Sequence, residues 1–420
     1  MVIKQIHLKD FRLFENLTVD FDERLNIFLG MNGAGKSALL DGIAILLSSF
    51  AARLGDWRDA NGNMYFIQEN DIQYGKKSTE IEIGAKYKSE SWNWQLTSSH
   101  NRTNIIEIKK IASTVLADLE KDTNANIPIL VYYGYKRANA LKRRTALKVN
   151  FMQLLAYKNA LNPTIESFND FEEWFIEEEG LEDKIRLEKD NSYRNPKLQI
   201  VRNVVYSFLN KLGTNRFSNL KIKKDRRLTI YSSLVITKDS SELELSQLSA
   251  GEKLILSTVI DIAHRLTLAN PSLENPLEGQ GIVLIDEIDL HLHPQWQREV
   301  VPALLTTFPN LQFIITTHSP QVLSKIEKKH IFIIEDGQIV KNPPNTYGKD
   351  TNTILNTVFK TDERPSDIKQ KIILCSQLLD DGDLEKGKAI LKELTNILGE
   401  EDPEIIEAKT FLHFYAEQTI

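Results

Sequence analysis

The sequence predicts an α/β protein with a parallel core sheet, and three observations support this. Four short apolar runs, at 25–29, 127–133, 281–285 and 313–316, lie between segments with helical spacing. Unbroken runs of this length are typical of parallel strands that are buried on both faces. A glycine-rich segment separates the first run from an apolar helix, and the last sixty residues have helical spacing. We therefore expect a parallel sheet between helices, followed by a C-terminal helical tail.

The composition is that of an ordinary globular protein. Of the 420 residues, 41% are hydrophobic and 26% are charged, which excludes a fibrous or wholly disordered chain. The single cysteine, Cys375, excludes an internal disulfide framework and a four-cysteine zinc site. The opening MVIKQIHLKD does not read as a secretory signal, and no run reaches the ~18 apolar residues of a membrane helix. We therefore expect a soluble, cytoplasmic protein of two or three domains that does not contact a membrane.

The first lobe, residues 1–137, contains the strands nearest the N-terminus. Residues 2–8 and 17–21 alternate between apolar and polar side chains, and further strand pattern flanks a polar turn within 80–96. We expect these strands to form an antiparallel β subdomain beside the core sheet.

A helical insert is predicted at 138–218 and a second lobe at 219–360. In the insert, apolar residues that we interpret as core repeat at helical spacing before Gly213; they are Phe168, Phe171, Phe175, Leu198, Val201, Val205, Phe208 and Leu212. In the second lobe, strand pattern at 219–245 precedes a helix at about 251–269 and the last two apolar runs.

The last segment, 361–420, is predicted to be an acidic tail of three helices, with breaks at Gly382 and from Gly399 to Pro403. It holds 14 acidic and 7 basic residues, a balance of −7 in a chain whose net charge is −6. A separate module for assembly or partner docking and a solvated helical surface explain this charge equally well. One helix carries an apolar stripe, formed by Leu384, Leu391, Leu394 and Leu398. Because a short helical hairpin cannot bury it, we expect the stripe to pack on the rest of the chain, on a second copy or on another protein.

Residues 30–37, GMNGAGKS, match the phosphate-binding motif G-x-x-x-x-G-K-[ST] between a predicted strand and a helix. Backbone N–H groups in such a loop surround phosphates, and the helix N-terminus adds positive potential. Lys36 is expected to reach the β- and γ-phosphates of ATP, and Ser37 to bind Mg²⁺. The remaining phosphate-binding residues are expected to be Asn32, Gly33, Ala34 and Gly35. The alternative is an ordinary glycine turn.

The apolar run 281–285 ends in two carboxylates, Asp286 and Glu287. Ligands of open parallel sheets bind at the carboxyl ends of the strands, so these residues are expected beside the phosphates. Asp286 is placed to hold Mg²⁺, and Glu287 to orient or deprotonate the attacking water. Standing alone, the motif would be read as an exposed acidic turn.

Two weaker segments point the same way. Residues 248–253, LSAGEK, stand just before a helix, where free N–H groups near Ser249 and Gly251 favour an anion, although the segment is also a fair helix cap. His318 follows the strand FIIT, where it could bind a γ-phosphate, although a lone histidine at a strand end is usually structural.

Taken in their order along the chain, the four segments resemble the ABC-type ATPase superfamily shared by SMC-like, RecF-like and OLD-family proteins. GMNGAGKS is similar to Walker A, LSAGEK to the ABC signature, IVLIDE to Walker B, and His318 to the switch histidine. LIDEIDLHLHPQWQ and FIITTHSPQVL resemble the single-chain AAA-type ATPases of bacterial defence islands. The likeness covers about residues 1–340, and DERP and EEDPEIIEAK in the tail resemble the ATPase subunit of Septu and related retron systems.

The resemblance implies an ATPase head that dimerises around two ATP molecules, with a higher homo-oligomer left open. It implies that Ser249 and Gly251 contact ATP held on the partner's Lys36, and that Asp289 lies in a loop at the dimer interface. It also implies Mg²⁺ as cofactor and a separate HNH-type nuclease as the effector in antiphage defence. The resemblance argues against a metal pair at His291 and His293.

The lid residue over the nucleotide stays open between Gln68, Gln73 and Arg137. DNA is an open partner, because basic residues gather in two places and either gathering is also explained as a solvated face. The two gatherings are Lys136, Arg137, Lys142, Arg143 and Arg144, and Lys221, Lys223, Lys224, Arg226 and Arg227.

Two alternatives to a defence ATPase are weighed: a RecF-like repair or recombination ATPase acting on DNA, and an ATP-binding scaffold that hydrolyses too slowly to cycle. Salt-sensitive DNA binding would favour the first, and tight ATP binding without turnover the second. The spacing between Lys36 and Ser249 is too short for the coiled-coil arms of SMC proteins, and we expect no OLD-type nuclease domain after His318.

Overall fold

The structure is a computed structural model, and it describes residues 1–55, 66–98, 105–134, 150–162, 168–213, 217–224, 232–340 and 342–418. The chain forms two compact units, Met1–Lys349 and Asp350–Ile420. None of the helices within the described ranges is both long enough and apolar enough to cross a membrane.

A six-stranded sheet forms the centre of the first unit, in the order β13-β12-β3-β11-β10-β6. Its strands are β3 (Leu25–Leu29), β6 (Ile129–Tyr133), β10 (Gly281–Ile285), β11 (Leu311–Thr316), β12 (Ile331–Glu335) and β13 (Gln338–Ile339). All neighbours run parallel except β12 and β13. Every residue of β3, β6, β10 and β11 is buried, which confirms that the four apolar runs are core strands.

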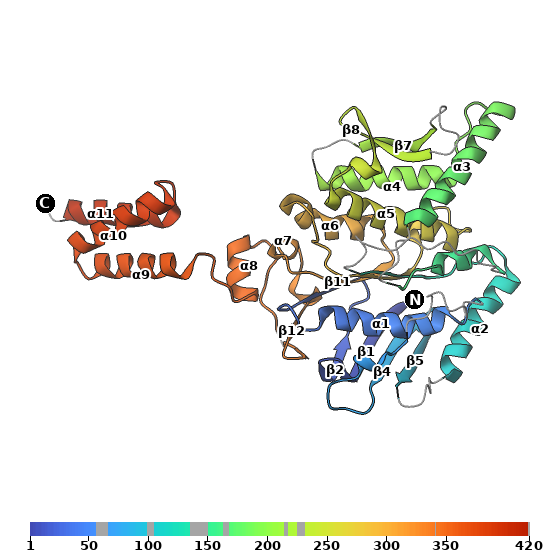
Figure 1. Ribbon diagram of the computed structural model, residues 1–420, viewed down its shortest axis with the longest axis horizontal. Helices are drawn as coiled ribbons and strands as arrows, with labels where there is room; N and C mark the ends of the chain where they lie inside the picture. The colour runs from blue at the N-terminus through green and yellow to red at the C-terminus, as the bar shows by residue number, and fades with distance from the viewer. Residues whose placement is uncertain are drawn as a thin grey trace. The chain divides into compact units, whose positions relative to one another are not determined.

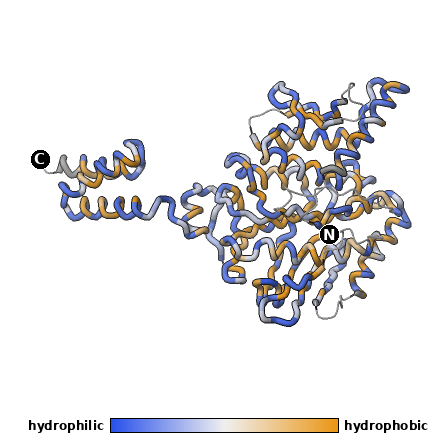
Figure 2. Tube along the Cα trace, viewed as in Figure 1, coloured by the Kyte–Doolittle hydropathy of each residue, from blue (hydrophilic) through white to orange (hydrophobic). Residues whose placement is uncertain are grey.

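Helices cover both faces of this sheet. Figure 1 shows α1 (Lys36–Ala51) on one side and α5 (Ala250–Ala269) and α6 (Pro294–Thr307) on the other. Figure 2 shows the hydrophobic colour concentrated in the strands and in the helix faces against them. This layered arrangement confirms the predicted α/β class.

A second, antiparallel sheet lies in the same unit, in the order β2-β1-β4-β5. It is built from β1 (Val2–Phe11), β2 (Phe14–Asp20), β4 (Glu80–Tyr87) and β5 (Glu90–Thr97), and it confirms the predicted β subdomain. The indole of Trp94 in β5 donates a hydrogen bond of 3.0 Å to the carbonyl oxygen of Leu46, which ties this sheet to α1. Helix α2 (Ile105–Lys121) lies outside the predicted elements, although Ile108, Ile111 and Val115 are buried at helical spacing.

Two long helices follow β6, and the three strands after them form a separate sheet. It contains α3 (Phe168–Glu188) and α4 (Pro196–Leu212), followed by the antiparallel strands β7 (Phe217–Lys224), β8 (Ser232–Lys238) and β9 (Ser241–Glu244). Phe171, Phe175 and the five predicted apolar positions of α4 are buried, as expected for core residues. Arg202 of α4 holds α3 through Glu179 at 2.9 Å and Glu182 at 3.0 Å.

Short helical turns complete the first unit. They are η1 (Glu69–Asp71), η3 (Met152–Tyr157), η4 (Leu245–Gln247), η5 (Pro276–Glu278), α7 (Pro320–Leu323) and η6 (Lys328–His330).

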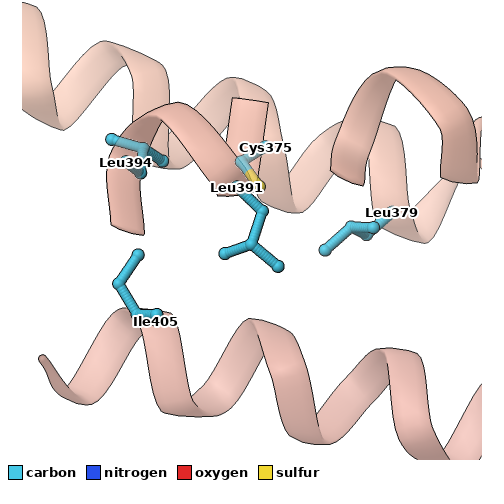
Figure 3. Close-up of a cluster of buried hydrophobic side chains, with 5 residues drawn as sticks. All are labelled: Cys375, Leu379, Leu391, Leu394 and Ile405. Atoms are coloured by element: carbon cyan, nitrogen blue, oxygen red, sulfur yellow. The ribbon is translucent and has the colours of Figure 1, made fainter. Parts of the chain in front are cut away.

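The second unit contains α8 (Thr351–Val358), α9 (Ser366–Asp380), α10 (Leu384–Leu398) and α11 (Pro403–Gln418). The last three confirm the predicted helices and their breaks. Their common core consists of Cys375, Leu379, Leu391, Leu394 and Ile405, which point into the space between the helices in Figure 3. Gly387 lets α9 and α10 approach closely, because a Cβ there would lie 2.6 Å from the side chain of Leu379.

The expectation for the apolar stripe is wrong. Leu391 and Leu394 are buried by the unit's own helices, and Leu384 and Leu398 pack against the same core. The prediction treated the tail as a short helical hairpin that cannot bury the stripe, whereas Ile405 from the last helix covers it. The helices of the second unit therefore bury this stripe themselves.

Candidate active site

The loop of residues 30–37, called the P-loop below, connects β3 to α1. Gly35 has φ of 105° and a Cβ there would lie 2.6 Å from the ring of Phe14, so both its backbone angle and its packing require glycine. Asn32 and Gly33 are exposed, and Ala34 and Gly35 are half-buried. The ammonium of Lys36 donates to the carbonyl oxygens of Gly30 at 2.9 Å and of Met31 at 3.1 Å, so it lies inside the curve of its own loop.

Three neighbouring parallel strands, β3, β11 and β10, end beside this loop. The predicted carboxylates follow β10, and Thr316 ends β11. The hydroxyl of Ser37 donates to Oδ2 of Asp286 at 2.8 Å. The hydroxyl of Thr316, at the end of β11, donates to Oδ1 of Asp286 at 2.6 Å and accepts from the backbone N–H of Glu287 at 2.8 Å. Glu287 has φ of 51°, a left-handed angle that is rare for a residue with a side chain. Thr316 therefore fixes both carboxylate-bearing residues at once.

Buried charge at the site shifts two pKa values. Burial lowers the pKa of Lys36, and the carboxylates of Asp286, Glu287 and Asp289 oppose that shift. Burial and the nearby Lys36 charge lower the pKa of His318, which favours a neutral imidazole. A cation facing several carboxylates and a neutral imidazole in one place can bind an anionic phosphate group together with a metal ion.

Asp289 organises the loop that carries His318. Its Oδ1 accepts from the hydroxyl of Thr317 at 2.5 Å and from the backbone N–H of His318 at 3.3 Å. Gly251 packs against this region, because a Cβ there would lie 2.3 Å from the carbonyl oxygen of His291. The segment of residues 248–253 thus rests on the loop that follows Glu287.

Ser249 faces solvent rather than the P-loop of its own chain. It is exposed and caps α5, donating to Oε2 of Glu252 at 2.8 Å and accepting from the backbone N–H of Glu252 at 3.3 Å. Within the described ranges, the hydrogen bonds of Ser249 all stay inside this first turn. The structure therefore brings together Lys36, Ser37, Asp286, Glu287 and His318, and leaves the hydroxyl of Ser249 outside that group.

The three candidates for the lid differ in position. Arg137 lies outside the described residues. Gln68 is exposed and caps the turn η1. Gln73 has a side-chain amide 3.5 Å from the carbonyl oxygen of Leu13, whose side chain lies against Gly35. The buried Oε1 of Gln73 has no hydrogen-bond partner in the part of the chain that the structure describes.

The other polar candidates have structural partners. His293 caps α6 by accepting from the backbone N–H of Gln295 at 3.3 Å. Among the described residues, no three His, Cys, Asp or Glu side chains are grouped to hold a metal ion. Lys221 and Lys223 both pair with Glu242, at 2.8 Å and 3.3 Å, and the first basic gathering lies outside the described residues.

The site also includes residues that sequence reasoning did not identify. Arg12 donates to Asp41 of α1 at 2.6 Å and to Asp71 of η1 at 2.9 Å, joining the P-loop helix to the segment that precedes Gln73. Thr316 had no local signal from its partners either, since both of them follow another strand, β10. Only the TTHS context around His318 pointed to it. Arg12 had no local signal, because its partners are 29 and 59 residues away.

Comparison with known proteins agrees with this geometry. A family model described as "AAA domain, putative AbiEii toxin, Type IV TA system" matches residues 25–324. The chain is 32% identical to the Retron Ec83 probable ATPase of Escherichia coli, with 89% of this chain and 78% of that protein covered. It is 30% identical to the Retron Vc95 probable ATPase of Vibrio cholerae serotype O1 biovar El Tor, with 86% and 80% covered.

A more distant relative comes from a second kind of defence system. The Septu protein PtuA of Bacillus thuringiensis is 24% identical, with 87% of this chain and 86% of that protein covered. The matched region contains the P-loop, the carboxylates after β10 and His318. The chain therefore belongs to this AAA domain family and is an ATPase of the kind found in retron and Septu defence systems.

Proposed function

We propose that two copies of this chain close around ATP and Mg²⁺, and that the resulting cycle regulates a separate effector nuclease in antiphage defence in the cytoplasm. The observation that carries the proposal is the division of the site. The P-loop cluster holds a cation, two carboxylates and a histidine, while Ser249 is exposed and, among the described residues, bonds only within its own turn. A second copy would supply the missing signature residues to each nucleotide.

The residues at the P-loop fit a magnesium ion. The hydroxyl oxygen of Ser37 and Oδ2 of Asp286 are 2.8 Å apart. Oxygen ligands of Mg²⁺ lie at ~2.0–2.1 Å in octahedral geometry, which puts adjacent oxygens about 2.8–3.0 Å apart, so these two residues would suit the ion. When bound, the ion neutralises the phosphate charge that develops during transfer.

The remaining roles follow from the chemistry of each side chain. Glu287 is in place to orient the attacking water and accept its proton, and its angle is held by Thr316. His318, kept neutral by burial, can donate a hydrogen bond to a γ-phosphate oxygen. The buried Oε1 of Gln73, which has no hydrogen-bond partner among the described residues, makes Gln73 our choice for the lid residue.

The effector proposal rests on the relatives and on the second unit. The matched proteins are named as parts of retron and Septu systems, and the resemblance of the tail implies an HNH-type nuclease as partner. Residues 361–420 carry 14 acidic and 7 basic residues on a unit whose apolar core is already filled. We assign this unit to assembly or nuclease docking through its surface.

Complementation tests the shared site. A Lys36→Ala chain loses phosphate binding, and a Ser249→Arg chain cannot complete the partner's site. In a mixture, one intact site forms from Lys36 of the second chain and Ser249 of the first, so ATP hydrolysis should recover to at most half of the wild-type rate per heterodimer. Heterodimers that form but stay inactive would contradict the shared site.

Deletion tests the second unit. A chain that ends at residue 349 should remain soluble and bind ATP, because the first unit is compact by itself, but should fail to assemble or to copurify with the product of the neighbouring gene. Normal assembly and normal nuclease binding by the shortened chain would contradict the assignment. Copurification and light scattering measure the two properties.

A further inference from the structure

Two adjacent tyrosines at the end of β6 bond to the two helices on which the site is built. Successive side chains of a strand point to opposite faces of its sheet. The hydroxyl of Tyr132 donates to Oδ1 of Asp41 in α1 at 2.9 Å, and the hydroxyl of Tyr133 donates to Oδ2 of Asp261 in α5 at 2.7 Å. Figure 1 shows these helices on opposite sides of the sheet.

The same strand end also holds the site's own carboxylate. Tyr132 is in register with Leu284 and Tyr133 with Ile285 of β10. The backbone N–H of Asp286 donates to the carbonyl oxygen of Tyr133 at 2.8 Å. The end of β6 is therefore joined to the start of the Asp286 segment, to α1 and to α5.

Each acceptor carboxylate is bound by an arginine as well. Asp41 accepts from Arg12 at 2.6 Å, and Asp261 accepts from Nε of Arg265 at 2.7 Å. Arg12 continues to Asp71 of η1, and Arg265 continues to the carbonyl oxygens of Ala156 at 2.6 Å and Lys158 at 2.9 Å. These bonds form one connected network from η1, across the sheet, to η3.

The two tyrosines and the Asp261–Arg265 pair are buried, which makes their hydrogen bonds costly to lose. Tyr132 is 4% exposed and Tyr133 7% exposed. Burial raises the pKa of Asp41, and Arg12 and Tyr132 oppose that shift. Removing one donor next to a buried carboxylate leaves the acceptor partly unsatisfied, and bonds to charged groups are the stronger ones.

We propose that Tyr132 and Tyr133 are positioning residues for the two half-sites that one chain contributes. Tyr132 sets the orientation of α1, which begins at Lys36, and Tyr133 sets that of α5, which begins after Ser249. This rests on the proposed function, in which the P-loop of one chain meets residues 248–253 of the other. The proposal predicts that the Tyr132 hydroxyl is needed in the chain that supplies the P-loop, and the Tyr133 hydroxyl in the chain that supplies residues 248–253.

The complementing heterodimer separates the two roles. In its one intact site, one chain supplies the P-loop and the other chain supplies residues 248–253. The Ser249→Arg chain is the P-loop donor, and the Lys36→Ala chain is the signature donor. We expect Tyr133→Phe in the signature donor to lower kcat about tenfold, with a smaller loss when it is placed in the P-loop donor. Tyr132→Phe should show the reverse order and should also raise KM for ATP, because α1 carries Lys36.

Tyr157→Phe is the matched control. Its buried hydroxyl donates to the carbonyl oxygen of Pro128 at 2.6 Å and bonds to neither α1 nor α5. This variant should give equal and near-normal rates in either chain. Equal losses for Tyr132→Phe or Tyr133→Phe in both placements would overturn the proposal, because a general loss of stability does not depend on which half of the site a chain supplies.

Hydrogen exchange keeps the inference separate from the shared site. If the mixture of Ser249→Arg and Lys36→Ala chains is inactive without any tyrosine substitution, the composite site is wrong. The full-length Tyr132→Phe and Tyr133→Phe chains then test the positioning roles alone. Faster amide exchange confined to α1 in Tyr132→Phe and to α5 in Tyr133→Phe would support the positioning roles. Unchanged exchange in both helices would overturn them.

Discussion

Thr316 offers the sharpest test of how the carboxylates are held. It is 0% exposed, and its one hydroxyl bonds both Asp286 and Glu287. Thr316→Val keeps the branched shape that suits the end of β11 and removes both hydrogen bonds. Thr316→Ser keeps the hydroxyl and removes only a methyl group, so it is the matched control.

The expected magnitude follows from the two bonds. A hydrogen bond to a charged group contributes ~1.5–3 kcal/mol and a neutral one ~0.5–1.5 kcal/mol, so the valine variant should lower the free energy of unfolding by about 2–4.5 kcal/mol. The serine variant loses one buried methyl, which is worth about 1 kcal/mol. Because Glu287 would lose the bond that holds its left-handed backbone, hydrolysis in the valine variant should fall ~10- to 100-fold.

Urea denaturation measures the stability change, and single-turnover hydrolysis with saturating ATP measures the chemical step. Nucleotide affinity should change less than the rate, since Lys36 and the P-loop are untouched. A valine variant that is folded and hydrolyses ATP at the wild-type rate would refute the reasoning. So would a serine variant with an equal loss, because it would assign the effect to packing.

Three further outcomes are expected. Glu287→Gln should keep nucleotide affinity and stop hydrolysis, because the acceptor for the water's proton is lost while Asp286 remains; binding and single-turnover assays compare the two. Leu394→Ala should destabilise the second unit by about 2–5 kcal/mol through a cavity in its core while ATP affinity stays unchanged, as proteolysis and nucleotide titration would show. The ring centroids of His264 and Trp174 are 4.5 Å apart, and burial lowers the pKa of His264 to about 3, so the unfolded chain takes up a proton below pH ~6.5 that the folded chain does not. Stability should therefore fall by up to about 1.4 kcal/mol per pH unit from pH 6.5 downward, and His264→Phe should flatten that dependence in denaturation curves at several pH values.

Local spacing was enough to predict the elements that carry the site. The apolar run 281–285 is a strand with the same bounds in the structure, and so is 25–29. The breaks at Gly382 and from Gly399 to Pro403 separate the tail helices as predicted. These features depend on a few consecutive residues, whose periodicity and turn chemistry act within one element. The same is true of the P-loop, because its glycines and Lys36 are adjacent in the chain.

Tertiary structure alone decided which residues meet. Ser37 and Asp286 are 249 positions apart, and Tyr133 and Asp261 are 128 apart, so no local pattern connects either pair. The tail stripe gave the same lesson, because Ile405, which covers it, belongs to α11 and not to α10, the helix that carries the stripe. A sequence specifies the period and ends of an element through neighbours along the chain. The order of strands and the packing of helix on helix depend on the free energy of burying faces against one another, and that is settled only when the whole chain has folded.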